Sequence, residues 1–149
     1  MDLSSLYSEI ITEHNMSNHN KRHIEGADVL EKGHNPSCGD EIELELKLQG
    51  DLIEDAGYTG VGCAISQAST SIMIDLIRGK TLEEAKQLIE IFLGMIKREI
   101  TDEQELEILE DALALRNIAN MPSRVKCAVL AWHTLEETIK KRALEDKND

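Results

Sequence analysis

Aromatic residues are scarce in this chain of 149 residues, where they make up 3% of the sequence with one tryptophan and one phenylalanine. The core must therefore be built from leucine, isoleucine, valine, alanine and methionine. This length allows one domain with a sizeable core and is too short for two comfortable ones. We therefore expect a single domain over residues 1–149.

Long apolar runs are also missing, and none reaches the length that a membrane-spanning helix requires. The segment Met1–Ile10 lacks the basic flank and the continuous apolar stretch of a secretory signal, so we expect a cytoplasmic protein.

Basic residues are few, with 16 lysines and arginines against 29 acidic residues and a formal net charge of −13 at pH 7. Such a surface repels phosphate backbones and anionic lipid, which argues against nucleic-acid and membrane partners. It favours a partner with a basic patch, although solubility alone is the other interpretation.

Cysteine occurs three times, an odd number, in a chain without an export signal. A disulfide framework is disfavoured in a reducing compartment, so these residues are better interpreted as thiols or metal ligands.

The strongest strand signal is the segment Ile42–Leu48, in which apolar and polar residues alternate without a fault. Gly50–Asp51 predicts a turn, and Leu52–Tyr58 predicts the returning strand of a hairpin. The polar segment His14–Pro36 is expected to be a loop with at most a short edge strand over Ala27–Leu30.

Apolar periodicity and capping signals predict helices around this hairpin. They cover Leu3–Glu13, Ala64–Ile77, a helix opened by the capping box at Thr81, a helix from Thr101 to about Arg116 opened by a second capping box, and a last helix capped by Ser123. The sequence thus predicts an α+β fold, a small antiparallel β-sheet packed against about four to five α-helices.

Each cysteine lies at a position where the neighbouring residues favour metal binding or a reactive thiol. Cys38 stands between Pro36 and Gly39 in a loop, and Asp40 follows two residues later, so both side chains can reach one ion. Cys63 lies at a strand-to-helix junction, where unpaired amides and the helix dipole favour a thiolate.

Cys127 lies in the first turns of the last helix, where Arg124 and Lys126 add positive potential. Three thiolates and one carboxylate suit a tetrahedral zinc ion, and the same set could hold an iron–sulfur cluster. Taken singly, each cysteine also suits a small buried hydrophobic position, Cys127 most of all.

Three stretches carry a family resemblance: Asn35-Pro36-x-Cys38-Gly39-Asp40, Gly60-x-Gly62-Cys63-x-Ile65-Ser66-x-Ala68-Ser69-x-Ser71, and Pro122-x-Arg124-x-Lys126-Cys127-Ala128-x-Leu130-x-Trp132. They resemble the IscU/NifU-like iron–sulfur cluster assembly family, closest to its zinc-binding SufU branch, over about residues 35–142. The resemblance implies an IscU-like fold and the metal ligands Cys38, Asp40, Cys63 and Cys127.

Two features favour the zinc branch. Lys126 stands where the scaffold branch has a histidine, and the helical segment between Cys63 and Cys127 is longer than in that branch. One feature departs from the family: residues 19–22 read His-Asn-Lys-Arg, without the proline of the usual Asn-Pro-Arg-Asn-like motif.

The resemblance implies a zinc-dependent sulfur acceptor that works with a SufS-like cysteine desulfurase and with downstream assembly components. The chain would then be a sulfurtransferase-type partner and not a stand-alone enzyme. Cys38 would leave Zn²⁺ to accept sulfur, a histidine of the partner would take the vacated position, and Arg124 would stabilise or steer the persulfide.

Two alternatives remain open from the sequence. One is a scaffold on which a [2Fe–2S] cluster is assembled and transferred, and the other is a structural zinc module that serves only for interaction. Among the histidines, His34 is an alternative ligand or proton relay beside Cys38, although a solvated position is favoured. We expect His14, His19, His23 and His133 to be exposed.

Overall fold

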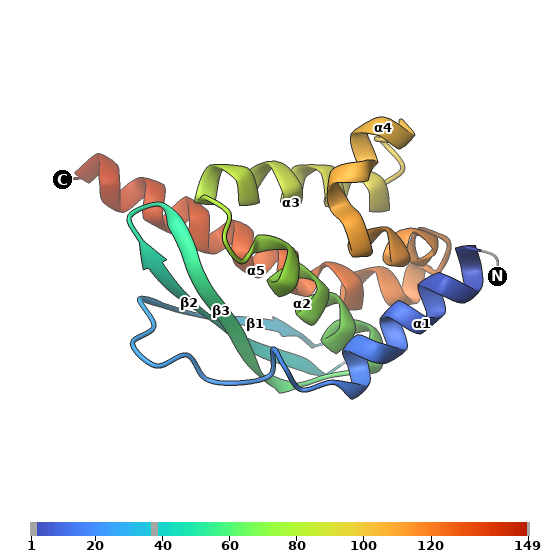
Figure 1. Cartoon of the computed structure of the whole chain (residues 1–149), viewed down its shortest axis with the longest axis horizontal. Helices are drawn as coiled ribbons and strands as arrows, with labels where there is room; N and C mark the ends of the chain where they lie inside the picture. Colours follow the sequence, from blue (N-terminus) through green and yellow to red (C-terminus); the bar gives the residue numbers. More distant parts are fainter. Residues whose placement is uncertain (1–2, 37–38, 149) are drawn as a thin grey trace.

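The computed structural model describes residues 3–36 and 39–148, which form a three-stranded antiparallel sheet with helices packed on it (Figure 1). In chain order the elements are α1 (Leu3–Met16), β1 (Val29–Asn35), β2 (Asp40–Gln49), β3 (Leu52–Val61), α2 (Ala64–Ile77), α3 (Leu82–Ile96), α4 (Glu103–Leu106), the 3₁₀ helix η1 (Glu107–Asn120) and α5 (Pro122–Asn148). The predicted α+β class is confirmed.

The sheet has the strand order β1-β2-β3, and both neighbouring pairs are antiparallel. The expected edge strand over Ala27–Leu30 is misplaced and too short. β1 pairs with β2 along its whole length, from Val29 opposite Leu46 to Asn35 opposite Asp40. Its own apolar pattern is weak, so the strand owes its length to the backbone ladder that β2 offers.

The apolar face of the sheet is covered by two helices. Ile42, Leu44 and Leu46 of β2 are buried, while α2 packs on β3 and α5 packs on β1 and β2 (Figure 1). α3 and η1 contact α5 and α2 respectively and form the outer layer, while α1 lies along α2 and η1. The core therefore sits between the sheet and the pair α2 and α5.

The opposite face of β2 is partly covered by the segment that follows α1. Glu45 is only 3% exposed, and its carboxylate accepts a hydrogen bond from the backbone N–H of Ile24 at 3.1 Å and contacts Nδ1 of His23 at 2.7 Å. Gly57 lies opposite Glu45, and a Cβ there would stand 2.6 Å from the carbonyl oxygen of Arg22. The absence of a side chain at position 57 thus lets this segment approach the sheet.

The centre of the helical layer is an aromatic pair. Phe92 of α3 and Trp132 of α5 stack with ring centroids 3.9 Å apart, and both are fully buried. The indole Nε1–H of Trp132 donates to Oγ of Ser69, which itself donates to the carbonyl of Ala128. The middle of α2 and the first half of α5 are thereby joined by a buried polar link.

The helix boundaries are partly as predicted. α2 spans Ala64–Ile77, and Thr81 opens α3 with both hydrogen bonds of a capping box. No helix within residues 3–36 and 39–148 has the combination of length and apolar character that crossing a bilayer requires.

The predicted helix from Thr101 to about Arg116 is wrong. Asp102, not Thr101, caps the single turn of α4, and the 3₁₀ helix η1 follows with a break at Glu110, whose φ is 48°. Leu106, Leu109 and Leu115 are buried in the core. Their packing, and not the helical periodicity of the sequence, determines the conformation of this segment.

The predicted cap at Ser123 is also wrong, because α5 begins at Pro122 and Ser123 lies inside the helix. A proline suits the first position of a helix, where a backbone N–H would lack a helical acceptor in any case.

Candidate metal centre

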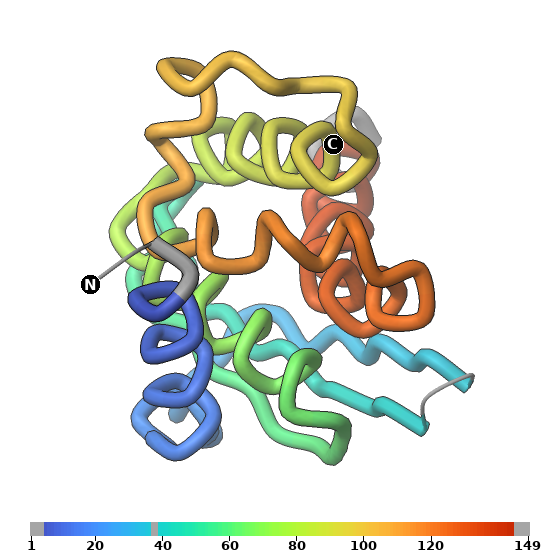
Figure 2. Tube along the Cα trace, turned by 90° about the vertical axis from the view of Figure 1, so that its right-hand side faces the viewer, coloured from blue at the N-terminus to red at the C-terminus, as the bar shows by residue number. Residues whose placement is uncertain are grey.

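Three chain segments that are far apart in the sequence converge at one end of the helical layer. They are the start of β2, the turn between β3 and α2, and the first turns of α5, which lie on the same side of the molecule in Figure 2. They contribute Asp40, Cys63 and Cys127, and one ligand atom from each lies within 4.8 Å of the other two.

Asp40 is fully buried and is tied to the turn that carries Cys63. Its Oδ1 accepts a hydrogen bond of 2.8 Å from the backbone N–H of Cys63. Cys63 is the N-cap of α2, and its Sγ accepts the backbone N–H of Ser66 at 3.4 Å. Both donors are polar groups at a helix N-terminus, and they orient a carboxylate and a sulfur toward the same space.

Glycine makes this close approach feasible. A Cβ at Gly62 would stand 2.7 Å from Oδ1 of Asp40, and a Cβ at Gly60 would stand 2.0 Å from the carbonyl of Glu41. The φ of Gly60 is +131°, a conformation that other residues rarely adopt. The run of glycines before Cys63 therefore serves the contact between β3 and the start of β2.

Cys127 approaches from the helix α5, and its side chain is 2% exposed. α5 packs on α2, and Oγ of Ser69 on α2 donates to the carbonyl of the fully buried Ala128, the residue after Cys127, at 2.6 Å. The position of the Cys127 sulfur is thus set by the packing of α5 against α2.

The donor set suits a thiophilic metal ion. Oδ2 of Asp40 is buried and has no hydrogen-bond partner among the residues that the structure describes. A buried anionic oxygen without a partner costs free energy unless a cation or a proton compensates it. Two sulfurs and one carboxylate oxygen are zinc ligands, so these residues fit a zinc ion that still needs a fourth donor.

The fourth predicted ligand, Cys38, lies outside the described residues. Arg124 and Lys126 are both exposed on the first turns of α5. His34 lies on β1 with 57% of its side chain exposed, and its Nε2 is 3.8 Å from a carboxylate oxygen of Glu41. Within the described part of the chain, His34 does not join the group of Asp40, Cys63 and Cys127.

The histidines are only partly as expected. His133 and His23 are exposed, but His14 is 8% exposed, so the prediction of an exposed His14 is wrong. It is buried because α1 packs on α2, where Nδ1 of His14 lies 2.8 Å from Oγ of Ser71.

The sequence reasoning missed Ser66, whose backbone N–H contacts the sulfur of Cys63. Its Oγ is buried and has no hydrogen-bond partner within residues 3–36 and 39–148. The available signal was its position three residues after a helix-capping Cys63, where an N3 amide meets the cap side chain.

Comparison with known proteins gives consistent matches. Residues 6–148 match the family described as NifU-like N terminal domain. The iron-sulfur cluster assembly scaffold protein IscU of Thermotoga maritima is 42% identical over 141 residues, which cover 95% of this chain and 97% of that protein. The zinc-dependent sulfurtransferase SufU of Bacillus subtilis is 39% identical over 141 residues, which cover 94% of this chain and 93% of that protein.

Among solved structures, the crystal structure of FiSufU from the thermophile Fervidobacterium islandicum AW-1 superposes with a TM-score of 0.82 at 38% identity. The match covers 91% of this chain and 97% of FiSufU. The fold described above is therefore shared along almost the whole of both chains.

Proposed function

We propose, from the premise that this chain belongs to the NifU-like N terminal domain family of iron–sulfur cluster assembly proteins, that it is a zinc-dependent sulfur acceptor of a cysteine desulfurase. The observation that carries the proposal is the convergence of Asp40, Cys63 and Cys127, with donor atoms within 4.8 Å of one another. SufU of Bacillus subtilis, a relative of similar length, is named as a zinc-dependent sulfurtransferase.

The proposed zinc ligands are Cys38, Asp40, Cys63 and Cys127. Cys38 stands two residues before Asp40 in the sequence, and two residues of chain span at most about 7 Å. The set would then be three sulfurs and one oxygen, a common number and type of ligands for zinc. Bound zinc keeps thiols deprotonated at neutral pH and so holds them as thiolates.

The proposed chemical step is thiol–persulfide exchange. The Cys38 thiolate attacks the terminal sulfur of a persulfide on the desulfurase, and the sulfur–sulfur bond of the donor breaks. The desulfurase cysteine leaves as a thiolate, and Cys38 becomes the persulfide. One sulfur atom moves and no external oxidant or reductant is consumed.

The other residues of the site have distinct proposed roles. Cys63 and Cys127 stay in place, because the first caps α2 and the second is buried on α5. Arg124 is exposed one helical turn before Cys127, where its guanidinium is available to a persulfide anion or to the partner. The net charge of −13 favours a desulfurase with a basic docking surface.

Metal analysis of anaerobically purified protein, with desulfurase turnover measured beside it, tests this function. We expect a colourless protein that contains zinc and accelerates the desulfurase. A protein that leaves desulfurase turnover unchanged would contradict the proposal and favour a structural zinc module. Arg124→Ala should lower the acceleration, whereas Lys97→Ala, an exposed change on the C-terminal side of α3, should not.

A second candidate is a scaffold that assembles and passes on a [2Fe–2S] cluster, the function in the name of the 42% identical Thermotoga maritima relative. The same residues would hold the cluster as cargo, since cysteine thiolates also bind iron–sulfur clusters. A brown protein that absorbs in the visible range after anaerobic purification would favour the scaffold over the sulfur acceptor.

A further inference from the structure

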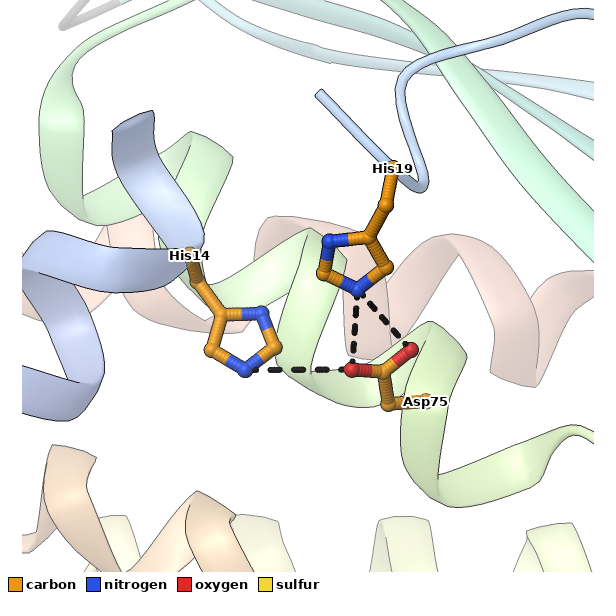
Figure 3. A group of neighbouring side chains, drawn as sticks. All are labelled: His14, His19 and Asp75. Atoms are coloured by element: carbon orange, nitrogen blue, oxygen red, sulfur yellow. Dashed lines mark hydrogen bonds and ion pairs between the residues drawn. The ribbon is translucent and has the colours of Figure 1, made fainter. Parts of the chain in front are cut away.

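The far end of α2 carries a second group of potential metal ligands. His14 comes from α1, His19 from the segment that follows α1, and Asp75 from the last turn of α2, and their ligand atoms lie within 4.8 Å of one another. Asp75 is twelve residues after Cys63, which is about 18 Å along a helix. Figure 3 shows both imidazole rings directed at the carboxylate of Asp75.

The distances in this group are close to those around a metal ion. Nε2 of His19 is 3.1 Å from Oδ2 of Asp75, and Nε2 of His14 is 3.8 Å from the same oxygen. Ligand atoms at about 2.1 Å from a tetrahedral ion lie roughly 3.4 Å from each other. The two histidine–carboxylate distances are therefore within a few tenths of an ångström of that value, and the two imidazole nitrogens lie no more than 4.8 Å apart.

The outer contacts of the two rings also match a metal site. Nδ1 of His14 is 2.8 Å from Oγ of Ser71, and Nδ1 of His19 is 2.6 Å from Oγ of Ser17. Histidine ligands use one ring nitrogen for the metal and fix the other through such a hydrogen bond. With each Nδ1 held by a hydroxyl group, both Nε2 atoms face Asp75.

The two oxygens of the Asp75 carboxylate have different sets of partners, although Nε2 of His19 lies within 3.2 Å of both. Oδ1 of Asp75 accepts hydrogen bonds from Asn20 at 2.9 Å and from Arg78 at 3.2 Å. Oδ2 is the oxygen that faces both histidines. The charge of Arg78 weakens cation binding at Oδ1, so an ion would use Oδ2.

Space and charge for an ion are present beside the group. A pocket of about 160 Å³ opens next to it, and its lining includes His14, Asp75, Glu110 and Asp111. Glu110 is the residue of η1 with a φ of 48°, so the chain bends sharply at the edge of this pocket. The pocket gives an ion access from solvent and leaves room for water as a further ligand.

We propose that His14, His19 and Asp75 form a second metal site, which binds a divalent first-row transition metal ion and is separate from the thiol site. Two imidazole nitrogens and one carboxylate oxygen favour Fe²⁺, Co²⁺ or Zn²⁺ over Mg²⁺ and Ca²⁺, which prefer oxygen ligands. An ion bound there joins α1, the segment after it and α2, so it fastens the N-terminal helix to the domain.

Titration of the metal-free 149-residue chain with Co²⁺ tests the site, because the two sites differ spectroscopically. Cobalt bound to thiolates shows an intense sulfur-to-metal charge-transfer band, and cobalt bound to imidazole and carboxylate shows only weak visible bands. We expect one equivalent with the charge-transfer band and one further equivalent without it. Paramagnetic shifts of the His14 and His19 ring protons should accompany the further equivalent.

His19→Ala should lose the equivalent that lacks the charge-transfer band, and Ser17→Ala should weaken it by about 10- to 100-fold. Both side chains lie at the surface, so these changes leave the core intact. His133→Ala, which removes an exposed histidine of α5, is the matched control and should keep the equivalent.

Equal cobalt stoichiometry in wild type and His19→Ala would overturn the second site, as would the absence of a further equivalent in wild type. A missing charge-transfer band would contradict the proposed thiol site alone and leave the His19-dependent equivalent as the measure of the second site.

Discussion

The backbone N–H of Cys63 donates a 2.8 Å hydrogen bond to Oδ1 of Asp40, so the turn that presents the Cys63 sulfur also fixes the buried carboxylate. The other oxygen, Oδ2, is buried and has no hydrogen-bond partner among the described residues, and the carboxylate has an oxygen within 4.8 Å of the sulfurs of Cys63 and Cys127. Asp40 thus has two separable roles: one oxygen holds the turn before α2, and the other is available to a metal.

Replacement of Asp40 should separate these roles. Asp40→Ala leaves the Cys63 N–H without its acceptor and should lower the free energy of unfolding of the metal-free protein by about 1–3 kcal/mol. Asp40→Asn keeps an oxygen acceptor and should cost less. Both variants lose the carboxylate donor, so both should accelerate a cysteine desulfurase less than wild type does.

Urea denaturation in the presence of a chelator and desulfurase turnover in the presence of zinc measure the two effects. Equal stability of the alanine and asparagine variants would contradict the structural role of Oδ1. Wild-type acceleration by both variants would show that the carboxylate has no part in sulfur transfer.

Gly62→Ala should act through Asp40. The added Cβ would stand 2.7 Å from Oδ1 and 3.3 Å from Cγ of Asp40, so the carboxylate must move away from the Cys63 N–H. We expect a loss of about 1–3 kcal/mol in metal-free protein, similar to the loss of the hydrogen bond. In an Asp40→Ala background the same substitution should cost much less, because the carboxylate atoms that the Cβ meets are gone and only Oγ of Ser66 remains, at 3.3 Å.

A double-mutant cycle by urea denaturation measures this coupling. Additive effects of the two substitutions would mean that the cost of the added Cβ arises elsewhere, for example at Oγ of Ser66, which would lie 3.3 Å away.

Zinc removal should destabilise the protein strongly. Structural zinc contributes on the order of 10 kcal/mol in small domains, as much as the whole stability of many domains. Chelation should therefore lower the melting temperature of wild type sharply. Cys127→Ala should lose most of the zinc-dependent stabilisation, because Cys127 is a buried ligand of the proposed site.

Thermal melts of wild type and Cys127→Ala, each with and without zinc, test this expectation. The metal-free proteins should melt at similar temperatures, since removing a small buried sulfur costs little compared with losing the ion. A melting curve of wild type that is the same with and without zinc would contradict the site.

Asp55 should contribute to stability in a pH-dependent way. Burial raises the pKa of Asp55, but hydrogen bonds from Arg22, the Ala56 N–H and Arg78 outweigh this effect and leave the pKa below its ordinary value of 3.8. A carboxylate whose pKa is depressed in the folded state stabilises the fold above the unfolded pKa, and this contribution disappears as pH falls through the folded pKa.

The stability of wild type should therefore include a contribution from Asp55 above about pH 4 that fades at lower pH. Asp55→Asn should remove that contribution, by no more than about 1 kcal/mol because the ion pairs lie near the surface. Urea denaturation between pH 2 and pH 7, roughly the range that spans the transition, measures the difference. Glu54→Gln, an exposed neighbour, is the control, and an equal effect of both variants would refute the assignment.

Local signals in the sequence were sufficient for several elements. The alternation in Ile42–Leu48 predicted β2, and the capping box at Thr81 predicted the start of α3. Each of these signals depends on residues that are close together in the sequence. The elements could therefore be predicted without any knowledge of tertiary contacts.

Most of the misses share one cause, which is contact between distant segments; the start of α5 at Pro122 is the exception, because a proline at the first helical position is a local signal. β1 owes its length to pairing with β2, and η1, whose Leu109 and Leu115 are buried, contacts α1, α2 and α3. His14 is buried because α1 lies on α2. Sequence spacing also gives no hint that His14, His19 and Asp75 meet, since Asp75 is more than fifty residues away from the others.

The candidate metal centre could be predicted only in part from the sequence. The residues alone left each cysteine open to a structural interpretation, and the family resemblance named the set that includes Asp40, Cys63 and Cys127. The structure brings these three together through the start of β2, the N-cap of α2 and the packing of α5.

Cys38 should be the thiol that accepts sulfur, and not Cys63 or Cys127. Sγ of Cys63 accepts the Ser66 N–H as the cap of α2, and Cys127 is 2% exposed within α5, so a change at either sulfur would disturb a helix. Cys38 is the remaining cysteine, next to Gly39 and Asp40 in sequence. Exchange requires an accessible thiolate, which a buried helical cysteine cannot offer to a partner.

Brief incubation with a persulfide-loaded desulfurase, followed by peptide mapping and mass spectrometry, locates the transferred sulfur. We expect the added mass of one sulfur atom on the peptide that contains Cys38, and its loss in Cys38→Ser. Ser37→Ala, a change at the adjacent position that keeps the thiol, should still accept sulfur. A label that resides mainly on the Cys63 or Cys127 peptide would show that a helix-anchored thiol carries the sulfur, which would require α2 or α5 to move during transfer.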